Sequence, residues 1–197
     1  MPRAKQRTPE LRDALVAAAG EVLAEEGPIG LTTRAVADRA HTSVPALYEL
    51  FGDKSGLVRA LFYEGFRRLE AHYGALSPTD DPISDLRSVL GAFRAFANAN
   101  PHLFEVMYAR PFAEFEPGPA ETATGAATRG ALVQAVDRCV AARRLAGDPV
   151  DIAHGLLALS SGLATQEVAG WLGSTPASVE RRWDVSLGAF LRGVQPN

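Results

Sequence analysis

The side chains that most often perform catalysis are few in this chain and widely separated. They are His41, His72, His102, His154 and the single cysteine, Cys139. No two histidines have the spacing of a helical zinc site, and the sequence contains neither a Gly-x-Ser-x-Gly turn nor a phosphate-cradling glycine loop. We therefore expect a protein that is not an enzyme and that uses neither a metal nor another cofactor.

Charge is distributed unevenly along the chain. The formal net charge is −3, yet the first twelve residues carry four basic side chains against one acidic side chain. These residues are Arg3, Lys5, Arg7 and Arg12 against Glu10. A basic arm on an acidic body suits a protein that binds DNA with one end. A solvated tail explains the same charges equally well.

Length and composition favour a globular helical protein. The chain has 197 residues, of which 47% are apolar, enough for one large domain or two smaller ones. Alanine and leucine dominate, which favours helices over strands. No segment approaches the apolar run of roughly 20 residues that a membrane span needs, and no signal peptide is recognisable. One cysteine cannot form an internal disulfide, so we expect a cytoplasmic protein.

Local signals place the helices. Thr8 can cap a first helix that ends at Gly27-Pro28, Thr32 a second that runs to Ala40, and Ser43 a third that ends before Gly52. Apolar periodicity and the positions of prolines predict further helices at about 53–74, 82–99, 101–110, 120–145, 149–172 and 176–193. No convincing strand is found. The predicted fold class is all-α, with about nine helices.

The second and third helices are separated by only three residues, His41 to Ser43. Two short helices with such a tight turn, and a small residue such as Ala37 or Ala40 where they cross, form a helix-turn-helix pattern. Many helical hairpins that bind no nucleic acid satisfy the same spacing. Spacing alone therefore leaves both interpretations open.

The residue types in this region are more informative than their spacing. The run from Leu31 to Ala40 (LTTRAVADRA), followed by Leu47-Tyr48, Phe51, Asp53-Lys54 and Leu57, resembles the N-terminal signature of the TetR family. The resemblance covers roughly residues 8–60. It implies a helix-turn-helix DNA-binding domain over residues 1–60 and a helical ligand-sensing and dimerisation domain over residues 61–197. It also implies a homodimer that presents two recognition helices to a palindromic operator.

Family roles are carried over by position. The resemblance implies phosphate contacts for the hydroxyls of Thr33 and Tyr48 and for the Lys54 amine, and a guanine contact for Arg34, whose fork geometry suits a base edge. The expected DNA-binding residues are Thr33, Arg34, Thr42, Ser43, Val44, Pro45, Ala46, Tyr48 and Lys54.

This sequence departs from the family pattern in two places. His41 replaces the usual turn glycine, and histidine visits the left-handed region more often than most residues. The recognition helix lacks the family's polar readers and carries Glu49, which would repel phosphate. Base recognition is therefore expected to rest on Arg34, apolar contacts and DNA shape.

The C-terminal half carries weaker signals. Residues 100–108 and 154–156 resemble one C-terminal subtype of the family, which implies dimerisation through the last two helices and a small-molecule site. Small and apolar residues of the first of these helices, among them Gly155, Leu156, Gly162 and Leu163, suit close helix packing. The expected ligand-binding residues are Phe93, Phe96, Phe104, Met107, Tyr108, Phe112, His154 and Gln166. Both sets also fit an ordinary helical core.

These inferences predict a ligand-responsive transcriptional regulator, and a repressor because repression is the family's commoner mode. Its expected partners are double-stranded operator DNA, a second copy of itself and a small apolar or amphipathic inducer, with no membrane. The alternative is an all-helical protein-interaction module whose hairpin does not touch DNA. The two differ in an observable property, since binding to DNA weakens steeply with salt.

Overall fold

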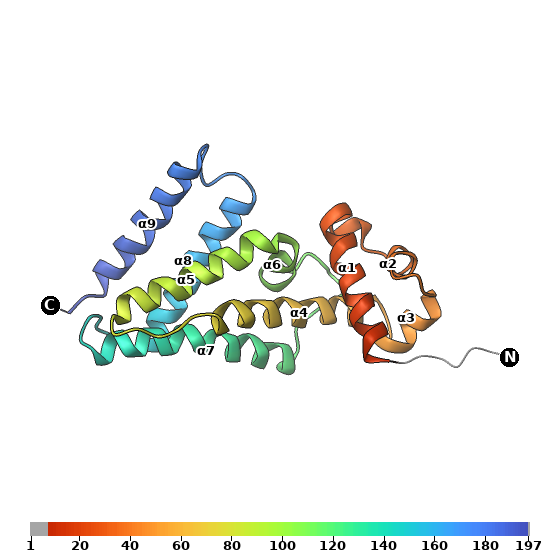
Figure 1. Ribbon diagram of the computed structural model, residues 1–197, viewed down its shortest axis with the longest axis horizontal. Coiled ribbons are helices and arrows are strands. Elements are labelled where there is room, and N and C mark those ends of the chain that lie inside the picture. Colours follow the sequence, from red (N-terminus) through yellow and green to blue (C-terminus); the bar gives the residue numbers. More distant parts are fainter. Residues whose placement is uncertain (1–7, 197) are drawn as a thin grey trace. The chain divides into compact units, whose positions relative to one another are not determined.

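The computed structural model describes residues 8–196. The basic residues Arg3, Lys5 and Arg7, expected to form an arm, lie outside this range. Within it the chain forms nine helices and no strand, which confirms the predicted all-α class. The helices are α1 (Pro9–Gly30), α2 (Thr33–Arg39), α3 (Val44–Phe51), α4 (Lys54–Gly74), α5 (Pro82–Ala99), α6 (Pro101–Tyr108), α7 (Pro119–Ala141), α8 (Pro149–Val168) and α9 (Pro176–Gly193) (Figure 1).

The helices of the N-terminal region begin where the sequence predicts. Side-chain oxygens of Thr8, Thr32 and Ser43 accept hydrogen bonds from backbone N–H groups three residues later, at 3.3, 3.1 and 3.3 Å. The Asp53 carboxylate does the same for the Gly56 N–H group at 2.7 Å. Each cap satisfies one of the N–H groups that the first helical turn leaves without a partner. These caps fix the start of all four helices.

Several helices end differently from the prediction. The first helix, expected to stop at Gly27, bends there, with φ at 69°, and continues to Gly30. The helices expected to end at 110, 145 and 172 stop instead at Tyr108, Ala141 and Val168. A residue with positive φ follows each of these three ends: Arg110 (52°), Arg143 (53°) and Gly170 (76°). A left-handed residue turns the chain away from the helix axis and so terminates the helix.

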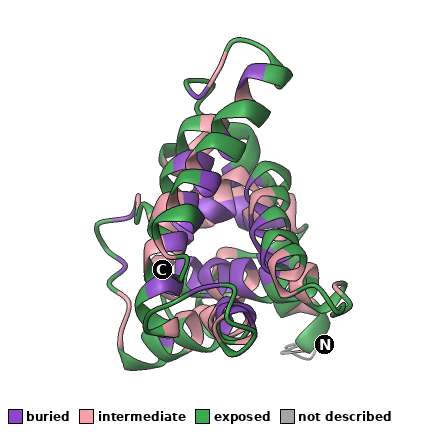
Figure 2. Cartoon of the chain, turned by 90° about the vertical axis from the view of Figure 1, so that its left-hand side faces the viewer, coloured by how far each residue is buried: buried purple, intermediate pink, exposed green. Residues whose placement is uncertain are grey.

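The chain forms two compact units. The first contains the residues up to Arg67 together with Asn100–Thr122, and the second contains Arg68–Ala99 together with the residues from Ala123 onward. In the first unit α1 packs on α2 and on α6; in the second α8 packs on α5 and on α9. Buried residues lie mainly where helices face one another, and the outer sides of the helices are largely exposed (Figure 2). No helix within the described range combines the length and the apolar character that crossing a bilayer requires.

Candidate nucleic-acid interface

A small apolar core holds α2 against α3. Val36, Ala37 and Leu47 have at most 1% of their surface exposed. Between the helices, His41 has φ of 51°, and the Thr42 N–H group donates to the Ala37 carbonyl at 2.9 Å. The left-handed conformation expected for His41 is confirmed, and it closes the tight turn of a helix-turn-helix.

The outward surface of this hairpin carries hydroxyl groups from both helices. Thr33 Oγ1 on α2 and Tyr48 Oη on α3 lie 3.5 Å apart. The Tyr48 side chain is large and 45% exposed, unlike its neighbour Leu47, which is fully buried. The structure therefore brings together two residues that the resemblance assigned to phosphate contacts, although they stand fifteen positions apart.

Arg34 projects from the same helix as Thr33. Its side chain is 89% exposed, and its Nε atom lies 4.0 Å from a carboxylate oxygen of Asp38, one turn along α2. An exposed ion pair of this length contributes little energy, so the guanidinium can exchange Asp38 for another partner. Of the remaining expected contacts, Ser43 and Pro45 are exposed, and Thr42, Val44 and Ala46 are half-buried. The Ser43 hydroxyl also caps α3.

Two cationic side chains, Arg39 and Arg12, connect the helix-turn-helix formed by α2 and α3 to α1. Arg39 of α2 pairs with Glu25 at 2.6 Å and with Glu21 at 3.3 Å. Its hydrogen bond and its charge lower the pKa of Glu25. The guanidinium of Arg12 lies 5.3 Å from the centre of the Phe51 ring at the end of α3. Arg12, counted with the basic arm in the sequence, thus packs within the folded unit.

Lys54, the expected phosphate contact at the start of α4, already has a partner. Its Nζ atom lies 2.8 Å from Oε1 of Glu114 and 5.2 Å from the centre of the Phe112 ring. The hydrogen bond from Lys54 lowers the pKa of Glu114. Sequence reasoning missed Glu114, since nothing local marks a residue so distant along the chain as a partner of the helix-turn-helix.

The expected ligand-binding residues are divided between the two units. Phe104, Met107 and Phe112 are buried in the first, where the Tyr108 ring lies 4.9 Å from that of Phe104 and 6.5 Å from that of Phe66. The buried Phe93 and Phe96 belong to the second unit, as do the exposed His154 and Gln166. His154 Nδ1 contacts the backbone oxygen of Val150 at 2.9 Å. Their assignment to one site stays a prediction.

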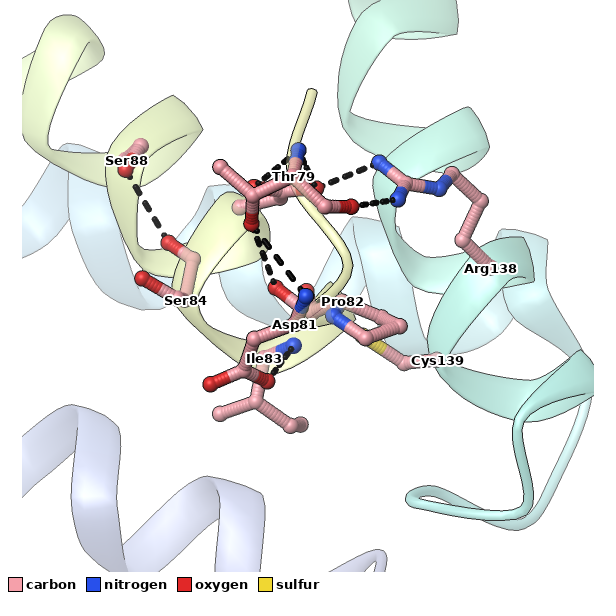
Figure 3. Close-up of polar contacts among 9 residues, drawn as sticks. Thr79, Asp81, Pro82, Ile83, Ser84, Ser88, Arg138 and Cys139 are labelled. Atoms are coloured by element: carbon pink, nitrogen blue, oxygen red, sulfur yellow. Dashed lines mark hydrogen bonds and ion pairs between the residues drawn. The ribbon is translucent and has the colours of Figure 1, made fainter. Parts of the chain in front are cut away.

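A groove of about 270 Å³ lies elsewhere, in the second unit, between the end of α4, the start of α5 and α7. A polar network holds one wall of it (Figure 3). The Asp85 carboxylate accepts from the Thr79 hydroxyl at 2.7 Å, from the Thr79 N–H group at 3.0 Å and from Arg138 at 2.5 Å. Arg138 also donates to the Thr79 carbonyl at 2.7 Å. None of the expected ligand-binding residues lines this groove.

Similarity to known proteins spans nearly the whole chain. Residues 15–61 match the family described as bacterial regulatory proteins, tetR family. Residues 86–190 match the family described as tetracyclin repressor-like, C-terminal domain. No protein of curated function matches the chain.

Solved structures show the same fold. A protein of unknown function from Rhodococcus sp. RHA1 is 28% identical, with a TM-score of 0.78 over 97% of this chain and 98% of its own. A TetR-like transcriptional regulator from the same organism is 20% identical, with a TM-score of 0.62 over 91% and 94%. The TetR family transcriptional regulator PfmR from Thermus thermophilus is 18% identical, with a TM-score of 0.68 over 92% and 99%.

A helix-turn-helix with hydroxyl groups and an exposed guanidinium on its outer surface, followed by a helical C-terminal region, agrees with both family matches. Together the matches cover more than half of the chain, and the family consists of transcription factors rather than enzymes. The chain belongs to the TetR family of bacterial transcriptional regulators.

Proposed function

We propose that this protein binds a palindromic DNA operator as a homodimer, represses transcription there, and is released by a small molecule. Residues 1–60 form the proposed DNA-binding segment, and residues 61–197 sense the ligand and dimerise. The observation that carries the proposal is the pair of hydroxyls of Thr33 and Tyr48, 3.5 Å apart and next to the exposed Arg34.

The chemistry of this surface suits a DNA backbone. Hydroxyl groups donate to phosphate oxygens and fix the register of a protein on the duplex, whereas Arg reads guanine through two parallel hydrogen bonds. Val44, Pro45 and Ala46 at the start of α3 offer apolar contacts of the kind that thymine methyl groups accept. The sequence preference therefore rests on few direct contacts and on the shape of the DNA.

Dimerisation through α8 and α9 has a revised set of candidate contacts. Leu156, Leu163 and Ala164 are buried within a single chain, and a side chain at Gly155 would collide with Phe190 of α9 at 2.6 Å. These residues therefore serve the packing of one chain. Three of the exposed apolar side chains of α8, α9 and their connection form the surface proposed to meet the second copy: Val168, Trp171 and Val185.

Ligand binding would act on DNA by changing the separation of the two recognition helices. A dimer binds two half-sites only when that separation matches about one or two helical turns of DNA, each of about 34 Å. A ligand that binds a differently spaced conformation more tightly shifts the population toward it, and the operator is released.

The test measures binding of labelled DNA by fluorescence anisotropy. DNA fragments that bind are first selected from a genomic library in the presence of excess random DNA. Wild-type protein is then compared with Tyr48→Phe, which removes only the hydroxyl, and with Arg34→Ala. Arg87→Ala, which removes an exposed cation of α5, is the matched control.

Salt-sensitive binding that weakens in Tyr48→Phe and Arg34→Ala, and is unchanged in Arg87→Ala, is the expected result. Equal weakening in Arg34→Ala and Arg87→Ala, with no effect of Tyr48→Phe, would mean that only overall charge matters. If ligand-free protein selected no fragment, the alternative of a helical protein-interaction module would replace the DNA-binding function.

A further inference from the structure

We propose that the groove between the end of α4, the start of α5 and α7 binds a compact, uncharged molecule that carries hydroxyl or carbonyl groups. The inference rests on the proposed function in one respect, because it makes this molecule the ligand that the regulator senses. All of the lining residues belong to the second unit, and none was expected to bind ligand from the sequence.

The size of the groove and the residues at its base suit a ligand with an apolar body. Its volume of about 270 Å³ lies near the lower end for small-molecule sites, which is roughly 300 Å³. Val89 of α5 and Ala135 of α7 are buried at its base, and Leu76 and Ala131 are half-buried beside them. Such a surface favours an apolar group of the size of a single ring.

The rim supplies hydrogen-bonding groups. Ser77, Ser84, Ser88 and Gln134 line the groove and are exposed. The Ser88 hydroxyl donates to the Ser84 carbonyl at 3.0 Å, as Figure 3 shows, and its oxygen can still accept. Within residues 8–196, the Gln134 amide has no protein partner, so it is available both to donate and to accept. A ligand with hydroxyl or carbonyl groups matches this rim.

The two charged residues of the lining already neutralise each other. Arg138 donates to Asp85 at 2.5 Å and to the Thr79 carbonyl at 2.7 Å, while Asp85 also receives both hydrogens that Thr79 offers. A charged ligand would have to separate this pair: an anion would leave the Asp85 carboxylate only its hydrogen bonds from Thr79, and a cation would leave Arg138 only the Thr79 carbonyl. The Asp85 side chain is only 11% exposed. The geometry therefore selects against ions of either sign.

The groove adjoins the end of α4, the helix that follows the helix-turn-helix, and this position allows a ligand to influence DNA binding. Tyr73 and Leu76, at the end of α4 and just after it, form part of its lining together with the connection Ser77–Thr79. The same α4 begins at Lys54, directly after the helix-turn-helix. A ligand seated in the groove contacts the last turn of the helix whose first turn carries an expected DNA contact.

Three ring compounds of similar shape and different charge test the proposal: cyclohexanol, cyclohexanecarboxylate and cyclohexylammonium. Binding to the free protein is followed by NMR of ¹³C-labelled alanine and valine methyl groups, with Ala131, Ala135 and Val89 as reporters. We expect saturable shifts of these methyl groups with cyclohexanol, and at least tenfold weaker binding of both ions. Ala131→Leu, which fills the groove, should abolish the shifts; Ala126→Leu, at an exposed position of α7 outside the lining, should not.

Three outcomes would overturn the proposal: no saturable shift at the reporters, preferential binding of either ion, or shifts that persist in Ala131→Leu. The thermal unfolding of both leucine variants is measured first to establish that they fold. Because the titration contains no DNA, its result is independent of DNA binding. Probe binding without DNA binding would refute the regulator function alone, and DNA binding without probe binding would refute this site alone.

Discussion

Lys54 illustrates how one residue can have two competing partners. In the free protein its amine contacts Glu114 at 2.8 Å and lies over the Phe112 ring. As a phosphate contact it would have to leave the carboxylate, since DNA and Glu114 compete for the same cation. In the proposed DNA complex, the segment after α6 would therefore influence the operator affinity without touching DNA.

We expect Glu114→Gln to raise the operator affinity by a factor of about 1.4 to 5. The side chains of Lys54 and Glu114 are 36% and 42% exposed. An ion pair between side chains this exposed contributes only about 0.2–1 kcal/mol. DNA binding to the variant would no longer have to overcome this energy. Fluorescence anisotropy with the selected fragment measures the change.

Two variants separate competition for Lys54 from a general effect of charge. Glu116→Gln removes an exposed carboxylate from the same segment and should raise the affinity less. In a Lys54→Ala background Glu114→Gln should have no effect, and Lys54→Ala itself should reduce the slope of log affinity against log salt by about one. If Glu114→Gln raised the operator affinity equally in the Lys54→Ala background, competition between DNA and Glu114 for Lys54 would be refuted.

The turn between α2 and α3 depends on a residue that tolerates an uncommon conformation. His41 is exposed and has φ of 51°. A β-branched side chain is poorly accommodated at this positive φ, whereas glycine adopts it readily. We expect His41→Val to lower the free energy of unfolding by about 1–2 kcal/mol and His41→Gly to change it by less than about 1 kcal/mol. Urea denaturation followed by circular dichroism measures both, and equal values for the two variants would contradict a conformational cause.

The connection between α4 and α5 should be sensitive to acid through Asp85. Hydrogen bonds from the Thr79 hydroxyl and N–H group, with a further one from Arg138, lower the pKa of Asp85 below its usual value of 3.8. A lowered pKa means that the ionised form stabilises the folded state above pH 3.8 and that this stabilisation is lost as the pH falls through the lowered value.

Asp85→Asn should therefore lower the free energy of unfolding at neutral pH and make it less dependent on pH below about 4. Chemical denaturation across the range from about pH 2.5 to neutral is the measurement. Asp80→Asn, which removes an exposed carboxylate from the same connection, is the control and should retain the acid dependence of the wild type. An identical acid dependence in Asp85→Asn and wild type would contradict the role of Asp85.

The helix starts were predictable from the sequence because their signals are local. Thr8, Thr32 and Ser43 each cap a backbone group three residues away. The helix ends were less predictable, since Arg110 and Arg143 adopt left-handed conformations without a residue type that announces them. Arginine has no intrinsic preference for this region, and its surroundings impose the conformation.

The candidate site shows the same contrast between features that local sequence predicts and features that tertiary packing imposes. The meeting of Thr33 and Tyr48 was implied by the resemblance to a family, and the short turn between α2 and α3 makes it possible. The pairing of Lys54 with Glu114 and the groove beside Arg138 join residues many positions apart. Such contacts follow from tertiary packing, which no local pattern encodes.

At the scale of the whole molecule, the proposed function requires two chains. The first unit contains one helix-turn-helix, and a palindromic operator has two half-sites. Joining two chains makes the second half-site contact intramolecular, which can raise the overall affinity by a factor of about one hundred or more. The surface that joins them is thus as important for DNA binding as the residues that touch it.

Trp171 is the most informative residue of this surface. It lies in the connection between α8 and α9, and 82% of it is exposed. A tryptophan that becomes buried at an interface contributes a large apolar area, and a carboxylate in its place would have to be buried without a partner. We expect Trp171→Glu to convert the proposed dimer to a monomer, as measured by sedimentation velocity, and to lower the operator affinity about one hundredfold.

Ile29→Glu is the matched control, because Ile29 is 95% exposed and belongs to the first unit. It should leave the protein dimeric. The far-ultraviolet circular dichroism of both variants should equal that of the wild type, since neither side chain is part of a core. A Trp171→Glu protein that remains a dimer would place the interface outside the α8–α9 connection. A monomer with undiminished operator affinity would instead show that one helix-turn-helix is sufficient, and the palindromic operator would have to be abandoned.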